Sequence, residues 1–91
     1  MIRRTIEVEN ELGLHARAAA KLVRLTSSFI SEVKLSRAGA GHSIDAKSIL
    51  GILLLAAKKG TRLDFVFDGP DEEVAASYVE SLFQNRFGEE Q

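Results

Sequence analysis

The chain of 91 residues contains no cysteine and no tryptophan, and it has a single proline. Without cysteine it can form neither disulfides nor thiolate metal sites, which fits a reducing compartment. Basic and acidic residues nearly balance, giving a net charge of −1, so nothing general predicts binding to nucleic acid or to anionic membranes. The longest apolar run, Ile49 to Ala57, is far too short to span a bilayer, and the N-terminus lacks the apolar stretch of a secretory signal. These absences predict a small cytoplasmic protein without membrane insertion or nucleic-acid partners.

What is present is typical of an ordinary globular protein. Hydrophobic residues make up 45% of the chain and charged residues 27%. A chain of this length supports one modest core, so we expect residues 1–91 to form one domain.

The hydrophobic period switches repeatedly along the chain. Polar and apolar residues alternate in four segments, which predicts strands at about 2–8, 32–37, 42–45 and 62–68. A helical period predicts three helices: Ala16 to about Ser28, Lys47 or Ser48 to a C-terminal turn at Lys58-Lys59-Gly60, and a last helix after Gly69-Pro70-Asp71. The order β-α-β-β-α-β-α predicts an α+β fold with the helices stacked on one side of a largely antiparallel sheet.

Finer features of these elements are also predicted. Asp45 is a possible cap of the second helix, and the tail Gly88 to Gln91 is expected to fray. The last helix should bury a stripe made of Val74, Ala75, Tyr78, Val79, Leu82 and Phe83.

The segment Gly13-Leu14-His15-Ala16-Arg17 is the most informative part of the chain. It places a histidine where a strand-like segment gives way to a helix, and the first turn of a helix has free backbone N–H groups that attract anions. The His15 imidazole can act as a nucleophile there, and the Arg17 guanidinium offers a planar set of donors to phosphate oxygens. By itself, however, His15 could simply end a loop and cap the helix.

A second segment, Lys47-Ser48-Ile49-Leu50-Gly51-Ile52-Leu53, follows about thirty residues later. Together the two segments, in a chain of this length and element order, resemble HPr, the histidine-containing phosphocarrier family of the bacterial phosphoenolpyruvate-dependent phosphotransferase system. The resemblance runs the whole length of the chain. It implies an open-faced β-sandwich, with a four-stranded antiparallel sheet and three helices on one face.

The resemblance also implies a function. His15 would accept a phosphoryl group from enzyme I, on Nδ1, and pass it to EIIA domains in sugar uptake or its regulation. The phosphate cradle would be the Arg17 side chain with backbone N–H groups at Ala16 and Arg17. The protein would be a monomeric carrier with no cofactor and no metal, since magnesium is needed by the donor enzyme. Ala18 stands where many family members have a proline, which would preset the first helical turn.

Further roles follow from the resemblance or from exposure. Ser48 matches the serine that HPr kinase/phosphorylase modifies in some bacteria, although a serine at a helix start is often only a cap.

The nine consecutive apolar residues from Ile49 to Ala57 exceed one helical stripe, so some of them should face outward. Lys21 could steer acidic partners or merely belong to a solvated basic face. The residues expected to dock partners are Ala20, Lys21, Arg24, Ile49, Leu50 and Leu53.

Two other functions compete with the phosphocarrier. One is an HPr-like regulatory protein, of the nitrogen-related branch or controlled through Ser48, that acts mainly by binding partners. The other is a small hydrolase, which lacks any recognisable second acid or base near His15. His42 is expected to be exposed and without a role, because no spacing supplies a metal pair with His15.

Overall fold

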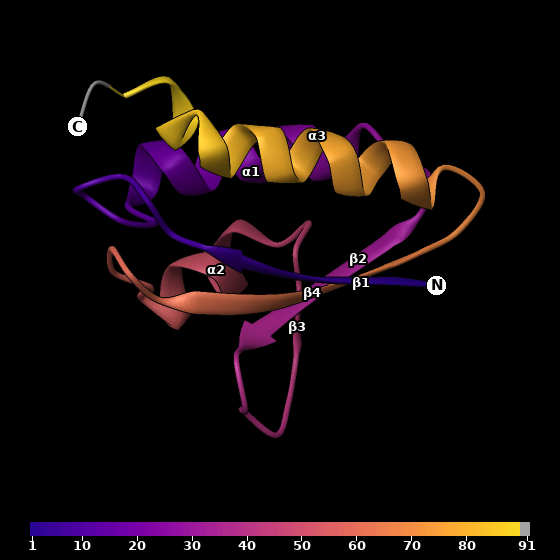
Figure 1. Cartoon of the computed structure of the whole chain (residues 1–91), viewed down its shortest axis with the longest axis horizontal. Coiled ribbons are helices and arrows are strands. Elements are labelled where there is room, and N and C mark those ends of the chain that lie inside the picture. The colour runs from indigo at the N-terminus through magenta and orange to yellow at the C-terminus, as the bar shows by residue number, and fades with distance from the viewer. Residues whose placement is uncertain (90–91) are drawn as a thin grey trace.

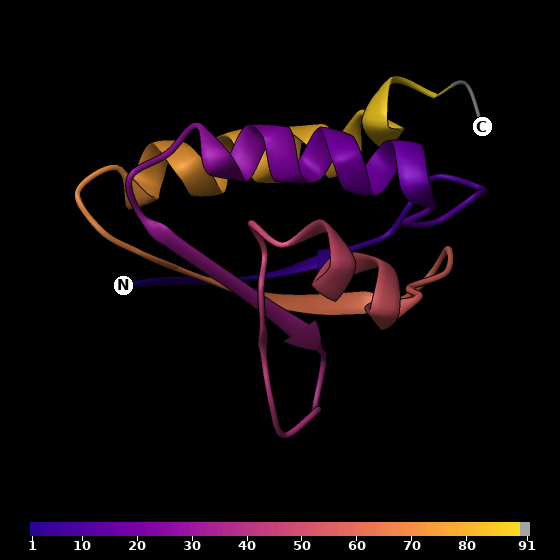
Figure 2. The same cartoon turned by 180° about the vertical axis from the view of Figure 1, so that it is seen from behind.

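The computed structural model describes residues 1–89. Four strands form one antiparallel sheet in the order β1-β4-β2-β3, and Figures 1 and 2 show the two long helices, α1 and α3, packed over one side of it. The elements are β1 (Ile2–Glu7), α1 (Ala16–Ser27), β2 (Glu32–Arg37), β3 (Ile44–Asp45), α2 (Ile49–Leu55), β4 (Arg62–Asp68), α3 (Glu72–Gln84) and a 3₁₀ turn, η1 (Arg86–Gly88). The predicted element order and fold class are therefore confirmed. No helix in the described part of the chain is long and apolar enough to cross a membrane.

The alternation of each strand directs one set of side chains toward the helices. In β4, Leu63, Phe65 and Phe67 are fully buried, while the residues between them are half-buried on the other face. Phe65 stacks beside Phe67 and meets Phe83 of α3 edge-on, with ring centroids 5.6 Å apart in the second pair. Helix α1 packs on the same core through Leu22, so the sheet and the two long helices share a single apolar layer.

Helix α2 is shorter than the sequence predicted. It begins after Ser48, whose Oγ accepts a hydrogen bond from the Gly51 N–H at 3.2 Å, so Ser48 and not Asp45 is its N-cap. It ends at Leu55, and Ala56 takes a left-handed conformation with φ 52°. The Arg37 guanidinium donates hydrogen bonds to the carbonyls of Leu55 and Ala56, which satisfies the exposed helix end.

Three other predicted features differ in the structure: the end of α2, the core stripe of α3 and the length of β3. Lys58-Lys59-Gly60 forms a separate turn closed by the Thr61 N–H on the Lys58 carbonyl. In α3, Val74 and Tyr78 are exposed and do not join the core stripe. Tyr78 lies beside Phe29, with ring centroids 6.1 Å apart, at the outer edge of the α1–α3 layer. Strand β3 covers only Ile44–Asp45, because the loop after β2 extends through His42 before pairing resumes.

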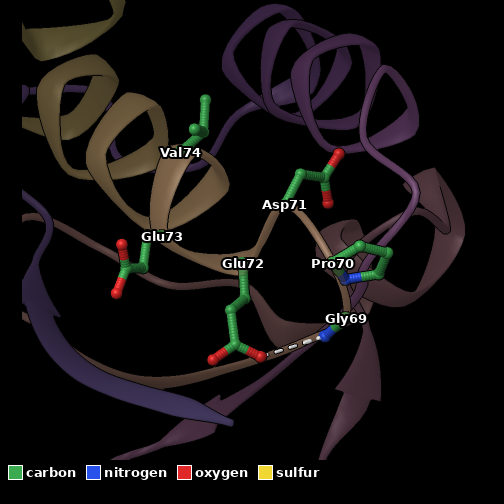
Figure 3. Close-up of a pocket in the computed structure, with 6 residues that line it drawn as sticks. All are labelled: Gly69, Pro70, Asp71, Glu72, Glu73 and Val74. Carbon is green, nitrogen blue, oxygen red and sulfur yellow. Dashed lines mark hydrogen bonds between the residues drawn. The ribbon is translucent and has the colours of Figure 1, made fainter.

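The turn between β4 and α3 ties distant parts of the chain together. Figure 3 shows the carboxylates of Asp71 and Glu72 pointing to different sides of this turn, with Glu72 accepting a hydrogen bond from the Gly69 N–H. Glu72 also pairs with the N-terminal ammonium group at 2.9 Å, and Asp71 accepts hydrogen bonds from the backbone N–H groups of Ile30 and Ser31. These contacts fix the start of α3, which lies at the opposite end of the helical layer from the start of α1 (Figure 1).

Candidate functional site

His15 stands at the start of α1, and the loop before it lies against the segment that follows α2. Gly13 has φ +67°, and the adjacent Leu14 N–H donates to the Ala57 carbonyl at 2.9 Å. A Cβ atom at Gly13 would lie only 2.5 Å from that same carbonyl oxygen. Glycine is therefore required both by the backbone conformation and by the close approach of the segment that follows α2.

The imidazole of His15 itself caps the helix. His15 has an extended backbone, with φ −72° and ψ 178°, and its Nδ1 accepts a hydrogen bond from the Arg17 N–H at 3.2 Å. Its carbonyl accepts from the Ala19 N–H, which is the first regular bond of the helix. The lone pair of Nδ1 thus faces the unpaired N–H groups of the first helical turn, and that turn contains no acidic residue.

The other ring nitrogen of His15 contacts the C-terminal end of the described chain. Nε2 lies 2.5 Å from Oε2 of Glu89, and the two side chains are 26% and 14% exposed. The second carboxylate oxygen of Glu89 accepts a hydrogen bond from Asn10 Nδ2 at 3.0 Å, and the same amide nitrogen donates to the Gly13 carbonyl. Glu89 lies in the segment predicted to fray, so that prediction is wrong for Gly88 and Glu89; Glu90 and Gln91 lie outside the described residues.

Electrostatics favour the ionised form of Glu89. Burial acts to raise the pKa of its carboxyl group, but hydrogen bonds from Asn10 and His15, together with the charges of His15 and Lys21, hold the pKa below its usual value. At neutral pH Glu89 is therefore a carboxylate that accepts a hydrogen from His15 Nε2. With Nε2 as donor, Nδ1 is the unprotonated nitrogen, and its lone pair accepts the hydrogen bond from the Arg17 N–H.

The basic residues predicted around the site fall into two groups. Arg17 and Arg24 are exposed, and within residues 1–89 the Arg17 guanidinium has no hydrogen-bond partner, so it is available to an incoming phosphate. Lys21 is half-buried instead, and its ammonium group donates to the Phe87 carbonyl at 2.6 Å. The sequence predicted that Lys21 either steers acidic partners or belongs to a solvated basic face. Neither prediction includes the contact with Phe87.

The predicted docking residues on α2 are exposed as expected. Ile49, Leu50 and Leu53 expose 43%, 65% and 38% of their surface, and Leu54, which the sequence did not single out, exposes 76%. Because the Ala57 carbonyl binds the Leu14 N–H, the C-terminal end of α2 adjoins the loop that carries His15. Ala20, on α1, is half-buried.

Ser48 lies farther from His15. The preceding residues contact the opposite end of α1, where Thr26 Oγ1 donates to the Ala46 carbonyl and Lys47 Nζ donates to the Phe29 carbonyl. Twelve helical residues span about 18 Å. The structure therefore does not bring Ser48 and His15 into direct contact. His42 is exposed, as predicted, on the loop between β2 and β3.

Comparison with known proteins agrees with this arrangement. The family model described as "PTS HPr component phosphorylation site" matches residues 2–85. The chain belongs to the HPr family. The phosphocarrier protein HPr of Cupriavidus necator is 48% identical over 89 residues, which cover 98% of both chains, and that of Xylella fastidiosa is 47% identical over 99% of both. A crystal structure of HPr from Thermoanaerobacter tengcongensis superimposes with a TM-score of 0.93 at 37% identity, covering 100% of both chains.

Membership in the HPr family settles the general role of the protein. It is a phosphocarrier of the phosphotransferase system and does not turn over a substrate by itself. Proteins of this family act in the cytoplasm, carry no cofactor, and work between enzyme I and EIIA proteins. Within residues 1–89 no group of three or more potential metal ligands comes together.

Proposed function

We propose that His15 Nδ1 is the atom that carries the phosphoryl group from phosphorylated enzyme I to an EIIA domain. The hydrogen bond from the Arg17 N–H to Nδ1 is the observation that supports this assignment most strongly. It supports Nδ1 as the unprotonated ring nitrogen, with its lone pair directed at the positive end of α1. A phosphoryl group on Nδ1 would lie against the first-turn N–H groups.

The cradle for that phosphate is small. The backbone N–H groups of Ala16 and Arg17 supply neutral donors, and the exposed Arg17 guanidinium supplies charge without being held in a fixed pair within the described chain. Such a loose cradle suits a carrier, since a tightly bound phosphate would be a poor donor to the next protein. The partner enzymes then provide most of the transition-state stabilisation.

We infer that partners dock on the exposed surface made by α1 and α2 beside His15. The apolar part comprises Ile49, Leu50, Leu53 and Leu54, and the α1 part comprises Ala20, Lys21 and Arg24. Arg24 supplies the exposed positive charge, whereas Lys21 contributes chiefly by holding the C-terminal turn. A single domain of residues 1–91 acting as a monomer suffices for this role.

Ser48 is the residue that an HPr kinase would modify. Its hydroxyl caps α2 through the Gly51 N–H, so a phosphate there would stay at the positive end of the helix while adding negative charge beside Ile49 and Leu50. This position lets Ser48 phosphorylation oppose docking without touching His15.

Mass spectrometry of the intact protein tests the assignment of His15. After incubation with phosphoenolpyruvate, magnesium and the cognate enzyme I, the wild type should gain one acid-labile phosphate. His15→Ala should gain none. His42→Ala, which removes the other histidine of the chain from an exposed loop, should behave like the wild type. Phosphate on His15→Ala would overturn the assignment.

A further inference from the structure

The contact between His15 and Glu89 joins residues 74 positions apart, and it is built into the fold by several restraints. Phe87 is 1% exposed and packs edge-on against Phe83, with ring centroids 4.8 Å apart. Lys21 Nζ donates to the Phe87 carbonyl at 2.6 Å. The chain then turns back toward α1 through left-handed conformations at Arg86, Phe87 and Gly88. These restraints place Glu89 next to the Nε2 edge of the His15 ring.

The Glu89 carboxylate is also held from its far side. Asn10 is fully buried and uses one amide nitrogen to bind both the Gly13 carbonyl and Glu89 Oε1. The loop that carries His15 and the turn that carries Glu89 are therefore coupled through a single buried side chain. Glu89 contacts only the Nε2 edge of the ring, so the Nδ1 edge stays directed at α1.

We propose that Glu89 is a positioning residue for phosphoryl transfer, which accepts the Nε2 hydrogen of His15 and so presents the Nδ1 lone pair to phosphorus. This proposal rests on the proposed function of His15. It adds a side chain from the C-terminal turn to a site otherwise formed by the start of α1.

The Nδ1 lone pair forms the bond to phosphorus while the bond between phosphorus and the donor breaks, and that electron pair leaves with the donor. The imidazole ring then bears a positive charge, with its proton still on Nε2. The Glu89 carboxylate stabilises this charge through a charge-assisted hydrogen bond. When the phosphoryl group passes to the acceptor, the same proton remains in place and the ring returns to neutrality.

A spectroscopic measurement tests the contact directly in the full chain. A ring N–H open to solvent exchanges rapidly, whereas one bonded to a half-buried carboxylate is protected. The one-bond ¹H–¹⁵N signal of His15 Nε2 should be visible in the wild type and lost in Glu89→Ala. Glu73→Gln, which removes a carboxylate from an exposed position on α3, should keep the signal. The exposed His42 supplies the internal reference for an unprotected ring.

Single-turnover phosphorylation by phosphorylated enzyme I tests the role. We expect Glu89→Ala to accept the phosphoryl group about tenfold more slowly than the wild type. Glu89→Gln keeps an acceptor oxygen without the charge and should be about fivefold slower. Glu73→Gln should match the wild type.

The outcomes separate the two proposals. A rate for Glu89→Ala equal to or faster than the wild type overturns the positioning role and leaves His15 as the carrier. Absence of the protected Nε2 signal from the wild type overturns it as well. If the wild type itself takes up no phosphate, the proposed function fails and the role of Glu89 in transfer fails with it.

Discussion

Gly13 determines how close the loop before His15 can come to the segment after α2. Its left-handed backbone and the missing Cβ allow the Leu14 N–H to reach the Ala57 carbonyl. His15 is the second residue after Gly13, so any shift of this contact moves the proposed nucleophile relative to the first turn of α1.

Replacing Gly13 with alanine should therefore affect both stability and transfer. The added methyl group would lie 2.5 Å from the Ala57 carbonyl oxygen. Alanine would also have to adopt a left-handed backbone conformation, which is unfavourable for a residue with a side chain. We expect Gly13→Ala to lower the free energy of unfolding by about 3 kcal/mol and to slow phosphorylation. Denaturant unfolding and single-turnover kinetics measure the two effects.

Gly39→Ala is the matched control for that variant. Gly39 has φ +82°, but a Cβ there would meet no atom within 4 Å. It should lose only about 1 kcal/mol for the left-handed backbone and should be phosphorylated at the normal rate. Equal losses in the two variants would show that the close approach at Gly13 is unimportant.

The sequence singles out His15 and Arg17, but it gives no sign of Glu89, which contacts the His15 ring. His15 and Arg17 stand in a compact motif whose local chemistry can be interpreted directly. Glu89 follows the turn glycine Gly88 in a short polar tail without any hydrophobic period, and its partners lie more than seventy positions away. No local pattern could have placed it against His15.

At the scale of elements, α2 presents apolar side chains to solvent. Leu50 and Leu54 expose more than half of their surface, although the same helix buries Ile52 completely. Seven residues make about two turns, so one side packs on the core and the other remains free. This is the surface that we assign to partner docking.

A charge at Leu50 should disrupt docking without disturbing the fold. We expect Leu50→Glu to weaken binding to enzyme I about tenfold, because an apolar contact is lost and a carboxylate is desolvated. The free energy of unfolding should change by less than about 0.5 kcal/mol. Titration calorimetry with enzyme I and thermal unfolding provide the two measurements.

Ile30→Glu controls for adding a carboxylate to an exposed apolar position. Ile30 is 77% exposed and lies between α1 and β2, outside the docking surface. It should bind enzyme I like the wild type. Equal weakening by both substitutions would argue for a general effect of charge and against docking through α2.

The lengths of the elements show where sequence patterns stop being informative. The apolar run of α2 continues to Ala57, but the helix ends at Leu55 because Arg37 binds its last carbonyls and Ala57 turns to meet Leu14. Both contacts come from other parts of the chain. Tyr78 has the spacing of a core residue, yet it lies at the edge of the helical layer beside Phe29.

At the scale of the whole molecule, Asp71 links two segments that are distant in the sequence, the α1–β2 connection and the start of α3. Its carboxylate accepts hydrogen bonds from the Ser31 hydroxyl and from the N–H groups of Ile30 and Ser31, across some forty positions of sequence. The Ser31 hydroxyl, followed by the Ile30 N–H, holds the pKa of Asp71 below its usual value. This carboxylate ties the α1–β2 connection to the start of α3.

The stability of the protein should consequently depend on the ionisation of Asp71. Because the pKa is lower in the folded state, the contribution is complete above the unfolded pKa, about 3.8, and is lost as the pH falls through the folded value. We expect Asp71→Asn to be less stable than the wild type at pH 7, and the difference to shrink as the pH falls below about 4. Denaturant unfolding across this pH range measures the difference.

Glu73→Gln removes one negative charge from the first turn of the same helix and serves as the control for that experiment. If the difference in free energy of unfolding between wild type and Asp71→Asn stays constant down to the lowest pH, the assigned ionisation of Asp71 is contradicted. If the two proteins have the same free energy of unfolding at pH 7, Asp71 does not contribute to stability.

The proposed phosphoryl transfer takes place at one atom, the Nδ1 of His15. Nuclear magnetic resonance of ¹⁵N-labelled protein, phosphorylated by enzyme I and phosphoenolpyruvate, can locate the phosphate through its coupling to nitrogen. We predict coupling to Nδ1 of His15, with the His42 signals unchanged, and loss of that coupling when an EIIA domain is added. Phosphate on Nε2, on His42 or on Ser48 would contradict the arrangement described for the start of α1.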